Sequence, residues 1–246
     1  MARESTRPID VHLRSGPQML QYGELARDLA RRHPGRVLDW GCGYGQVSAL
    51  LRSEGVEVVA FDYREGLDEP AVEPLERFPE IEAHLSPDPV ELPFEDDSFD
   101  TVLSCGVLEH VANPDGSLDE IHRVLRPGGV FFVTNLPNRY SYTEKLARLL
   151  GLYYHGKLPN DRVYTKSSAG DLLDRHGFLI RELRRVHMLP LTLGGPAGLV
   201  WWASAALARV PGLNLVATSL EIVATVGVDT DDQTATAAPR ARTDPR

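Results

Sequence analysis

The sequence predicts an α/β protein with a doubly wound, mostly parallel sheet of seven strands and an antiparallel strand at its edge. Three observations lead to this prediction. Short apolar, β-branched runs alternate with segments of helical spacing. The first run ends in a glycine-rich turn that opens a helix. Two further strand-like runs near the C-terminus are joined by a long connection. Right-handed crossovers then bring the carboxyl ends of the parallel strands, and any ligand, to one edge of the sheet.

Five strand-like runs and two helical segments fill the first half of the chain. The helix after the first strand places Val47 and Leu51 on one face. A Pro- and Glu-rich helical stretch is expected after the second strand. The second helix is ended by the Pro-Gly-Gly sequence at 127–129. We expect strands at 36–40, 57–61, 82–86, 99–105 and 130–135, and helices at 46–54 and 116–125.

The C-terminal part is less regular. Two strands would form an antiparallel pair at the sheet edge, with 192–211 as their connection. We assign 1–228 to one domain, and 229–246, which has no apolar period, to a disordered tail. We expect helices at 140–150, 168–176 and 197–208, and strands at 178–186 and 220–226.

Composition narrows the class of protein. The chain has 246 residues, of which 42% are hydrophobic, so it can bury one α/β core. Residues 1–10 hold no apolar signal, and prolines and glycines interrupt the uncharged stretch 188–208, so we expect a cytoplasmic protein that spans no membrane. A net charge of −9 argues against nucleic acid as a partner. Two cysteines, Cys42 and Cys105, suit a reducing compartment.

The segment 37–45 is the most informative part of the sequence. Its glycines at 41, 43 and 45 let the backbone turn sharply and approach a ligand closely. The dinucleotide pattern G-x-G-x-x-G requires a further glycine where this chain has Gln46. Asp39 precedes the loop, and a buried carboxylate there suits a cationic ligand group, such as an amino group, better than a pyrophosphate.

Asp62 closes the second strand, 21 residues after Gly41. A carboxylate at this place can accept hydrogen bonds from both hydroxyls of a ribose. NAD and S-adenosylmethionine (SAM) both carry a ribose, so Asp62 does not separate the two cofactors. Alone, it could equally be a helix cap or turn residue; together with the loop it predicts ribose binding.

Four segments in order resemble the class I SAM-dependent methyltransferases. They are VLDWGCGYG at 37–45, LPFEDDSFD at 92–100, VLEHV at 107–111 and LRPGG at 125–129. The nearest subgroup is type 11, which includes enzymes of ubiquinone and menaquinone biosynthesis. The resemblance covers roughly residues 37–135 and implies the Rossmann-like methyltransferase fold. It is specific for the cofactor and says little about the acceptor.

The resemblance implies a set of SAM-binding residues. The first segment would surround the methionine part, and the acid after the second strand would hold the ribose beside an aromatic side chain. An acid six residues before Phe94 would contact the adenine amino group, and Cys105 would pass under the sulfonium. The implied cofactor-binding residues are Asp39, Gly41, Cys42, Gly43, Asp62, Tyr63, Asp88, Pro89 and Cys105.

Two departures from relatives narrow the chemistry. Some relatives bind a divalent metal through E-x-x-E-H after the fourth strand, and here the first of these acids is replaced by Gly106. Glu109 and His110 alone make a poor site for a hard cation, so we predict no metal. The Asn/Asp-Pro-Pro-Tyr motif of many amide and nucleobase methyltransferases is also missing from the end of the fourth strand.

The acceptor side is predicted from fewer signals. A base would help to remove the proton of a hydroxyl acceptor, and the candidates are His155 and His110. The alternatives are a surface or packing role for the first and a structural hydrogen bond at a helix start for the second. In the family the segment after the fifth strand, here 136–176, forms part of the acceptor pocket. Asn138, Arg139 and Tyr140 are therefore candidate substrate contacts, although Arg139 could instead pair with Glu144.

The apolar helix at 197–208 carries Trp201 and Trp202. Core packing is the ordinary role of such a stripe; a lid over an apolar acceptor and peripheral contact with a membrane are the alternatives. We therefore predict a SAM-dependent methyltransferase for a small-molecule or lipid-like acceptor, with methylation on oxygen. The competing hypotheses are an NAD-dependent oxidoreductase and a non-catalytic protein with the SAM fold.

Overall fold

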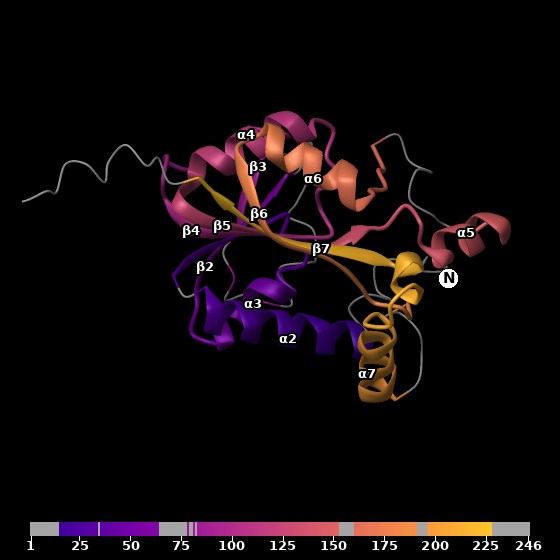
Figure 1. Ribbon diagram of the computed structural model, residues 1–246. Helices are drawn as coiled ribbons and strands as arrows, with labels where there is room; N and C mark the ends of the chain where they lie inside the picture. The colour runs from indigo at the N-terminus through magenta and orange to yellow at the C-terminus, as the bar shows by residue number, and fades with distance from the viewer. Residues whose placement is uncertain are drawn as a thin grey trace, which may run out of the picture.

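The computed structural model describes residues 15–33, 35–63, 78, 81, 83–152, 160–190 and 196–227. Within these residues, seven strands form one sheet in the order β3-β2-β1-β4-β5-β7-β6 (Figure 1). Strands β1 to β5 run parallel to one another, and β7 runs antiparallel between β5 and β6. The predicted fold class is confirmed, with the antiparallel strand one place inside the edge. The strands are β1 (Arg36–Trp40), β2 (Glu57–Tyr63), β3 (Ala83–Ser86), β4 (Phe99–Cys105), β5 (Leu125–Pro137), β6 (Phe178–Val186) and β7 (Ser219–Val226).

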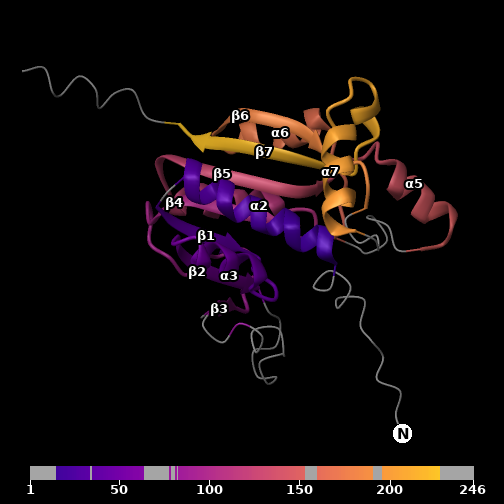
Figure 2. The same cartoon turned by 90° about the horizontal axis from the view of Figure 1, so that it is seen from below.

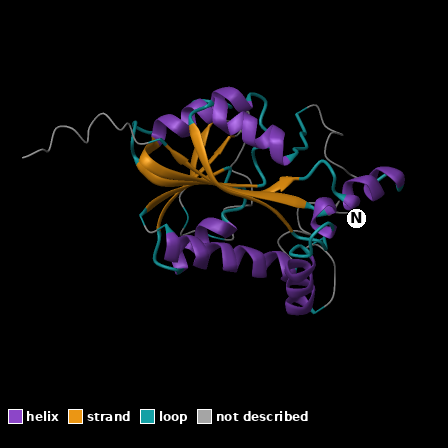
Figure 3. Ribbon diagram, in the orientation of Figure 1, coloured by secondary structure: helices purple, strands orange, loops and turns teal. Residues whose placement is uncertain are grey.

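Helices cover both faces of the sheet. Helices α4 and α6 lie on one face and α2 and α3 on the other, with α7 standing at the end of α2 (Figures 1 and 3). Seen from below, α2 crosses the sheet and its first turn meets α7 (Figure 2). None of these helices is long and apolar enough to cross a bilayer. They are α2 (Gly16–Arg32), α3 (Gln46–Ser53), α4 (Pro114–Val124), α5 (Tyr142–Leu149), α6 (Lys166–Arg175) and α7 (Ala197–Leu207), with a 3₁₀ turn η2 at Leu213–Val216.

The central strands are apolar almost throughout because both of their faces are covered. One apolar cluster lies under α4 and α6 and includes Phe99 and Phe131. A second lies under α2 and α3 and includes Leu29, Leu51 and Phe132. Each of these side chains is at most 1% exposed, and burying one contributes about 2 kcal/mol. The two clusters hold the strands in place from both faces of the sheet, and so they also position the edge at which the parallel strands end.

Helix α2 has no counterpart in the sequence prediction. Ser15 caps it by accepting a hydrogen bond from the Gln18 N–H, and Pro17 follows in the first turn. Its buried side chains include Tyr22, Leu25 and Leu29, which recur at helical spacing. Buried glutamines on the same face interrupt this apolar pattern and make it harder to recognise in the sequence. The cap and the spacing are nevertheless signals that the sequence contains.

Several boundaries differ from the predicted ones. Strand β5 begins at Leu125, five residues before the predicted start, because Leu125 already pairs with Phe99 ahead of a register shift. Helix α4 accordingly ends at Val124. Strand β3 begins at Ala83, since residue 82 is outside the described chain. The predicted helix after β2 and the predicted tail also lie outside it.

Candidate functional site

The loop after β1 is shaped by three glycines with positive φ, at +75° for Gly41, +53° for Gly43 and +76° for Gly45. The backbone N–H groups of Gly41 and Cys42 both donate to the carbonyl of Phe61, which ties the loop to β2. A Cβ at position 41 would lie 2.4 Å from a methyl carbon of Val107, whereas one at position 43 would meet no atom within 4 Å. The loop is therefore packed on one side and open on the other, as a ligand cradle requires.

Asp39 lies at the end of β1 and is only 1% exposed. Burial raises the pKa of its carboxyl to about 6, and the nearby charge of Asp62 acts in the same direction. The Ser48 hydroxyl donates to Oδ2 at 2.5 Å and offsets part of this rise. In the described chain no Lys or Arg side chain forms an ion pair with this carboxylate. Asp39 is thus a buried acid placed where a bound cation would stabilise its charge.

Asp62 follows at the end of β2, next to β1 in the sheet. Its Oδ2 accepts a hydrogen bond of 2.9 Å from the Gly43 N–H, so the carboxylate fixes the open side of the loop. Tyr63, the next residue, is 42% exposed and offers an aromatic face at the same edge. The structure brings Asp39, Asp62, Tyr63 and the loop together, as the sequence predicts.

Asp88 and Pro89 lie beyond the end of β3, at the outer side of the sheet, and both are exposed. Oδ1 of Asp88 accepts from the backbone N–H groups of Glu91 and Val90, each at 2.8 Å, and these bonds lower the pKa of the carboxyl. Asp88 therefore holds a turn through one oxygen. Its contact with adenine stays a prediction, with Oδ2 as the atom that would make it.

Cys105 ends β4, the strand on the other side of β1. Burial raises the pKa of its thiol, and Nδ2 of Asn135 lies 3.5 Å from its sulfur. The thiol is therefore protonated at neutral pH, and its contact with the sulfonium side of SAM stays a prediction.

Helix α2 adds polar side chains to this edge that the sequence reasoning missed. Tyr22 is buried, and burial is the main cause that raises the pKa of its phenol, followed by the nearby Cys105. The side chains of Gln46 and Gln18 hydrogen-bond to the phenol and lower that pKa. Gln46 opens α3, so Tyr22 joins α2 to the glycine loop. The sequence offered one signal for these residues, namely two glutamines and a tyrosine on the buried face of an amphipathic helix.

The predicted acceptor-side residues occupy different environments. Nδ1 of His110 lies 2.9 Å from Oδ1 of Asp161, whose side chain is 2% exposed, whereas the histidine is 43% exposed. Asn138 is fully buried, and its amide donates to the carbonyls of residues 215 and 217. Arg139 and Tyr140 are exposed beside it. Nothing in the described chain groups three side chains that could hold a metal ion. His155 lies outside the described residues.

Helix α7 is not a core helix. Trp202 is 73% exposed and Leu199 65% exposed, and the only buried residue within the helix is Ser204. The Ser204 hydroxyl accepts from the N–H groups of residues 188 and 189 and thereby ties α7 to the segment after β6. Core packing therefore does not explain this apolar sequence.

The family model described as "Methyltransferase domain", of type 11, matches residues 38–133. The chain is 43% identical over 94 residues to a "Demethylmenaquinone methyltransferase" of Clavibacter sepedonicus, which covers 38% of each protein. It is 38% identical over 156 residues to a "Probable S-adenosylmethionine-dependent methyltransferase" of Mycolicibacterium smegmatis, covering 63% of this chain and 56% of that protein. The chain thus spans about half the length of the curated relatives it matches.

A solved structure of a SAM-dependent methyltransferase from Thermotoga maritima superposes with a TM-score of 0.60 at 18% sequence identity. The superposition covers 88% of this chain and 91% of that protein, so the fold is shared over nearly the whole length. These comparisons confirm the predicted Rossmann-like fold and the resemblance of the central segment.

Proposed function

Because residues 38–133 are a methyltransferase domain of the SAM-dependent class, we propose that this protein transfers the methyl group of SAM to a small-molecule or lipid-like acceptor, on an oxygen atom. The observation that carries this proposal is the buried carboxylate of Asp39 beside the glycine loop. Its charge requires a cation, and the amino group of the methionine part of SAM supplies one. A pyrophosphate at the same place would meet repulsion from Asp39 and Asp62.

The side chains and backbone of the loop fit the rest of the cofactor. Asp62 is fixed by the Gly43 N–H, and its carboxylate at the end of β2 stands where ribose hydroxyls could donate to it. Tyr63 offers a surface for adenine. Bound SAM supplies a methyl group on a sulfonium, which is already activated toward attack. The protein must then align the acceptor oxygen behind that methyl group and take up the proton that the hydroxyl loses.

The pair of His110 and Asp161 supports methylation on oxygen. The buried Asp161 carboxylate holds Nδ1 of the imidazole, and Nε2 lies 3.9 Å from Oε1 of Glu109. An imidazole oriented in this way can accept a proton from a hydroxyl. We therefore propose His110 as the base, and His155 stays the alternative.

The exposed apolar face of α7 supports an acceptor with an apolar part. Trp202 and Leu199 lie on a helix that stands at the end of α2, near the cofactor edge. The same face would suit peripheral contact with a bilayer. Co-sedimentation with lipid vesicles tests this contact, and Trp202→Ser should reduce the bound fraction if the helix makes it.

Isothermal titration with SAM, S-adenosylhomocysteine and NAD tests the cofactor assignment. We expect micromolar binding of the first two and none of NAD. Asp62→Ala should weaken binding of S-adenosylhomocysteine about tenfold or more, since hydrogen bonds to a charged group are lost. Asp62→Asn is the matched control, because it keeps an acceptor for the Gly43 N–H while removing the charge. Binding of NAD alone would establish the oxidoreductase alternative.

Transfer of label from SAM to hydroxylated acceptors separates an enzyme from a non-catalytic binding protein. His110→Gln should lower kcat about 100-fold, the usual contribution of a general base, without changing the affinity for S-adenosylhomocysteine. A variant with wild-type kcat would exclude His110 as the base.

A further inference from the structure

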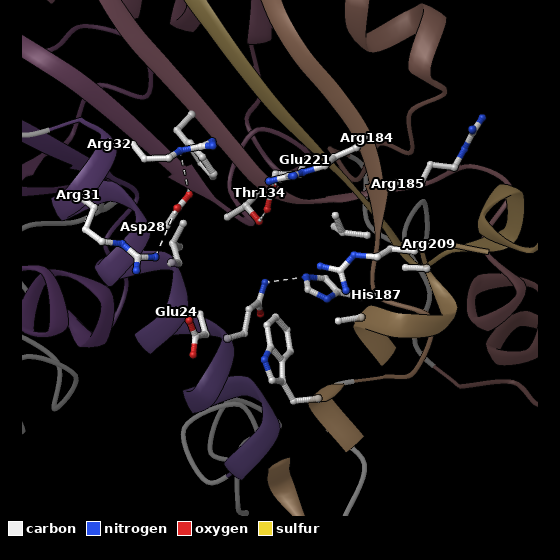
Figure 4. A pocket seen from close by; sticks show the side chains of 17 residues that line it. Glu24, Asp28, Arg31, Arg32, Thr134, Arg184, Arg185, His187, Arg209 and Glu221 are labelled. Carbon is white, nitrogen blue, oxygen red and sulfur yellow. Dashed lines mark hydrogen bonds and ion pairs between the residues drawn. The ribbon is translucent and has the colours of Figure 1, made fainter. Parts of the chain in front are cut away.

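A pocket of about 380 Å³ lies beside α2, between that helix, strands β5 to β7 and α7 (Figure 4). It is separate from the glycine loop and has no role in the cofactor assignment above. Its volume is that of a small-molecule site. The lining residues that matter here are Gln21, Thr134, His187, Trp201 and Arg209.

His187 is the central residue of this pocket. It follows β6, has a positive φ of 60° and is 6% exposed. Burial lowers the pKa of its imidazole to about 4, so the ring is neutral at physiological pH. Non-glycine residues with such a φ are uncommon and gather at functional sites.

A hydrogen-bond network holds this imidazole in one tautomer. Oε1 of Gln21 accepts from the Gln18 amide at 2.5 Å, so the Nε2 of Gln21 faces its other partners. That Nε2 donates to Oδ1 of Asn135 at 2.6 Å and lies 3.0 Å from Nε2 of His187. His187 therefore accepts at Nε2 and carries its proton on Nδ1, a buried atom that has no hydrogen-bond partner in the described chain. The pocket wall thus contains a buried N–H donor that no oxygen of the described chain satisfies.

An aromatic ring and a cation complete the pocket. The ring of Trp201 lies 5.3 Å from that of His187, tilted by 42°. Arg209, just after α7, extends toward His187 (Figure 4). Four other arginines line the pocket. Arg184 pairs with Glu221 at 2.6 Å, and Arg31 and Arg32 pair with Asp28 at 3.8 and 3.4 Å. Arg185 forms no ion pair within the described residues, and its guanidinium points away from His187 (Figure 4). Across the described residues, no carboxylate forms an ion pair with Arg209.

The pocket is connected to the cofactor edge through Asn135. Its Oδ1 accepts from Gln21, and its Nδ2 points to the sulfur of Cys105. Asn135 also has a positive φ, of 61°, at an irregularity of β5. The same network that orients His187 therefore reaches the end of β4, beside the glycine loop.

We propose that this pocket binds the methyl acceptor, and that the acceptor is a ring compound carrying a carboxylate. A single guanidinium matches a carboxylate in bidentate geometry, the N–H of a neutral imidazole adds a donor, and Trp201 provides a face for the ring. A phosphate dianion fits less well, because Glu221 lies in the same pocket. The proposal rests on the proposed methyltransferase function, and its test does not require methyl transfer.

Calorimetric titration with 2-naphthoate, in the presence of S-adenosylhomocysteine, tests the pocket. We expect the carboxylate to bind, and its neutral isostere 2-naphthamide to bind at least tenfold more weakly. Arg209→Gln should weaken binding of naphthoate at least tenfold and leave binding of naphthamide unchanged. Arg181→Gln is the matched control, because Arg181 is an exposed arginine of β6 that bonds to Thr225 outside the pocket.

His187→Gln tests the donor separately. This substitution should weaken naphthoate binding. Gln21→Glu removes the amide donor to Nε2 of His187, should shift the imidazole to its other tautomer, and should therefore weaken naphthoate binding as well. Equal losses in Arg209→Gln and Arg181→Gln, or equal affinity for naphthoate and naphthamide, would overturn the proposal. If S-adenosylhomocysteine binds and naphthoate does not, the pocket proposal fails alone; if neither S-adenosylhomocysteine nor SAM binds, the proposed function fails.

Discussion

Replacing Asp39 by asparagine should make the protein more stable while it loses affinity for SAM. Asp39 is buried, and burial raises the pKa of its carboxyl from an ordinary value of 3.8 to about 6 in the folded protein. A raised pKa means that the folded state binds the proton more tightly than the unfolded chain. The contribution of the Asp39 carboxyl to the free energy of unfolding is therefore fully present below pH 3.8. It declines as the pH rises toward 6 and stays reduced above pH 6.

The size of the effect follows from the shift in pKa. A shift of about two units corresponds to about 3 kcal/mol between the two protonation states. At pH 7.5 the ionised carboxylate therefore destabilises the free protein by up to about 3 kcal/mol. Asparagine removes this charge and keeps an oxygen for the Ser48 hydroxyl, so Asp39→Asn should gain most of that amount. It should also lose the part of the pH dependence that lies between about pH 4 and 6.

Urea denaturation at a series of pH values measures this difference between wild type and variant. The same samples titrated with SAM should show at least a tenfold loss of affinity in the variant, because the ammonium loses its charged partner. Wild-type affinity for SAM should rise between pH 5 and 7 as Asp39 ionises. Ser48→Ala is the control that removes the stabilising donor, and it should lower stability at pH 7.5. An Asp39→Asn variant that is no more stable than wild type, with an unchanged pH slope, would refute the reasoning.

Three further predictions concern stability. Gly41→Ala should reduce the melting temperature more than Gly43→Ala. Both positions have a positive φ, which costs about 1–2 kcal/mol for a residue with a Cβ. Only a Cβ at position 41 also clashes with Val107. Equal losses would show that the clash is relieved. Asn138→Ala should cost about 2–3 kcal/mol in urea denaturation, since two buried carbonyls lose their donor; a loss below 1 kcal/mol would contradict this. The pKa of His187 is lowered from 6.5 to about 4, so its contribution to stability falls as pH decreases from 6.5 to 4. His187→Gln should flatten that part of the pH dependence, and an unchanged profile would show that the imidazole does not titrate there.

The cofactor side of the site was predictable because backbone geometry requires particular residues there. Gly41 and Gly43 have φ values that other residues adopt at a cost, and Gly41 also lacks space for a Cβ. Asp39 and Asp62 follow directly from the ends of β1 and β2. These constraints act within about 25 residues of chain, so they leave a local pattern in the sequence.

The pocket proposed for the acceptor left no such pattern. The network of Gln21, Asn135 and His187 joins residues 114 and 166 positions apart in the chain. None of these residues has a spacing that marks it, and a buried histidine is not visible until β6 and α2 are placed. Arg209 becomes informative only when Arg184 and Arg32 are seen to pair with carboxylates and Arg185 to point away from His187 (Figure 4). Weighing histidines by their sequence neighbours selected His110 and His155, which stay candidates for the base, and gave no signal for the buried His187.

The glycine loop and the pocket beside α2 can vary independently, because different contacts hold them in place. The cofactor loop is fixed by backbone hydrogen bonds to Phe61 and Asp62, so a change there alters the loop itself. Trp201 and Arg209 belong to α7 and the residues after it, which attach to the sheet mainly through Ser204 and the first turn of α2. A substitution at either position changes the shape or charge of the pocket and leaves the loop intact. Acceptor choice can therefore change by side-chain replacement while binding of SAM is retained, and Arg209→Gln should leave the affinity for S-adenosylhomocysteine at the wild-type value.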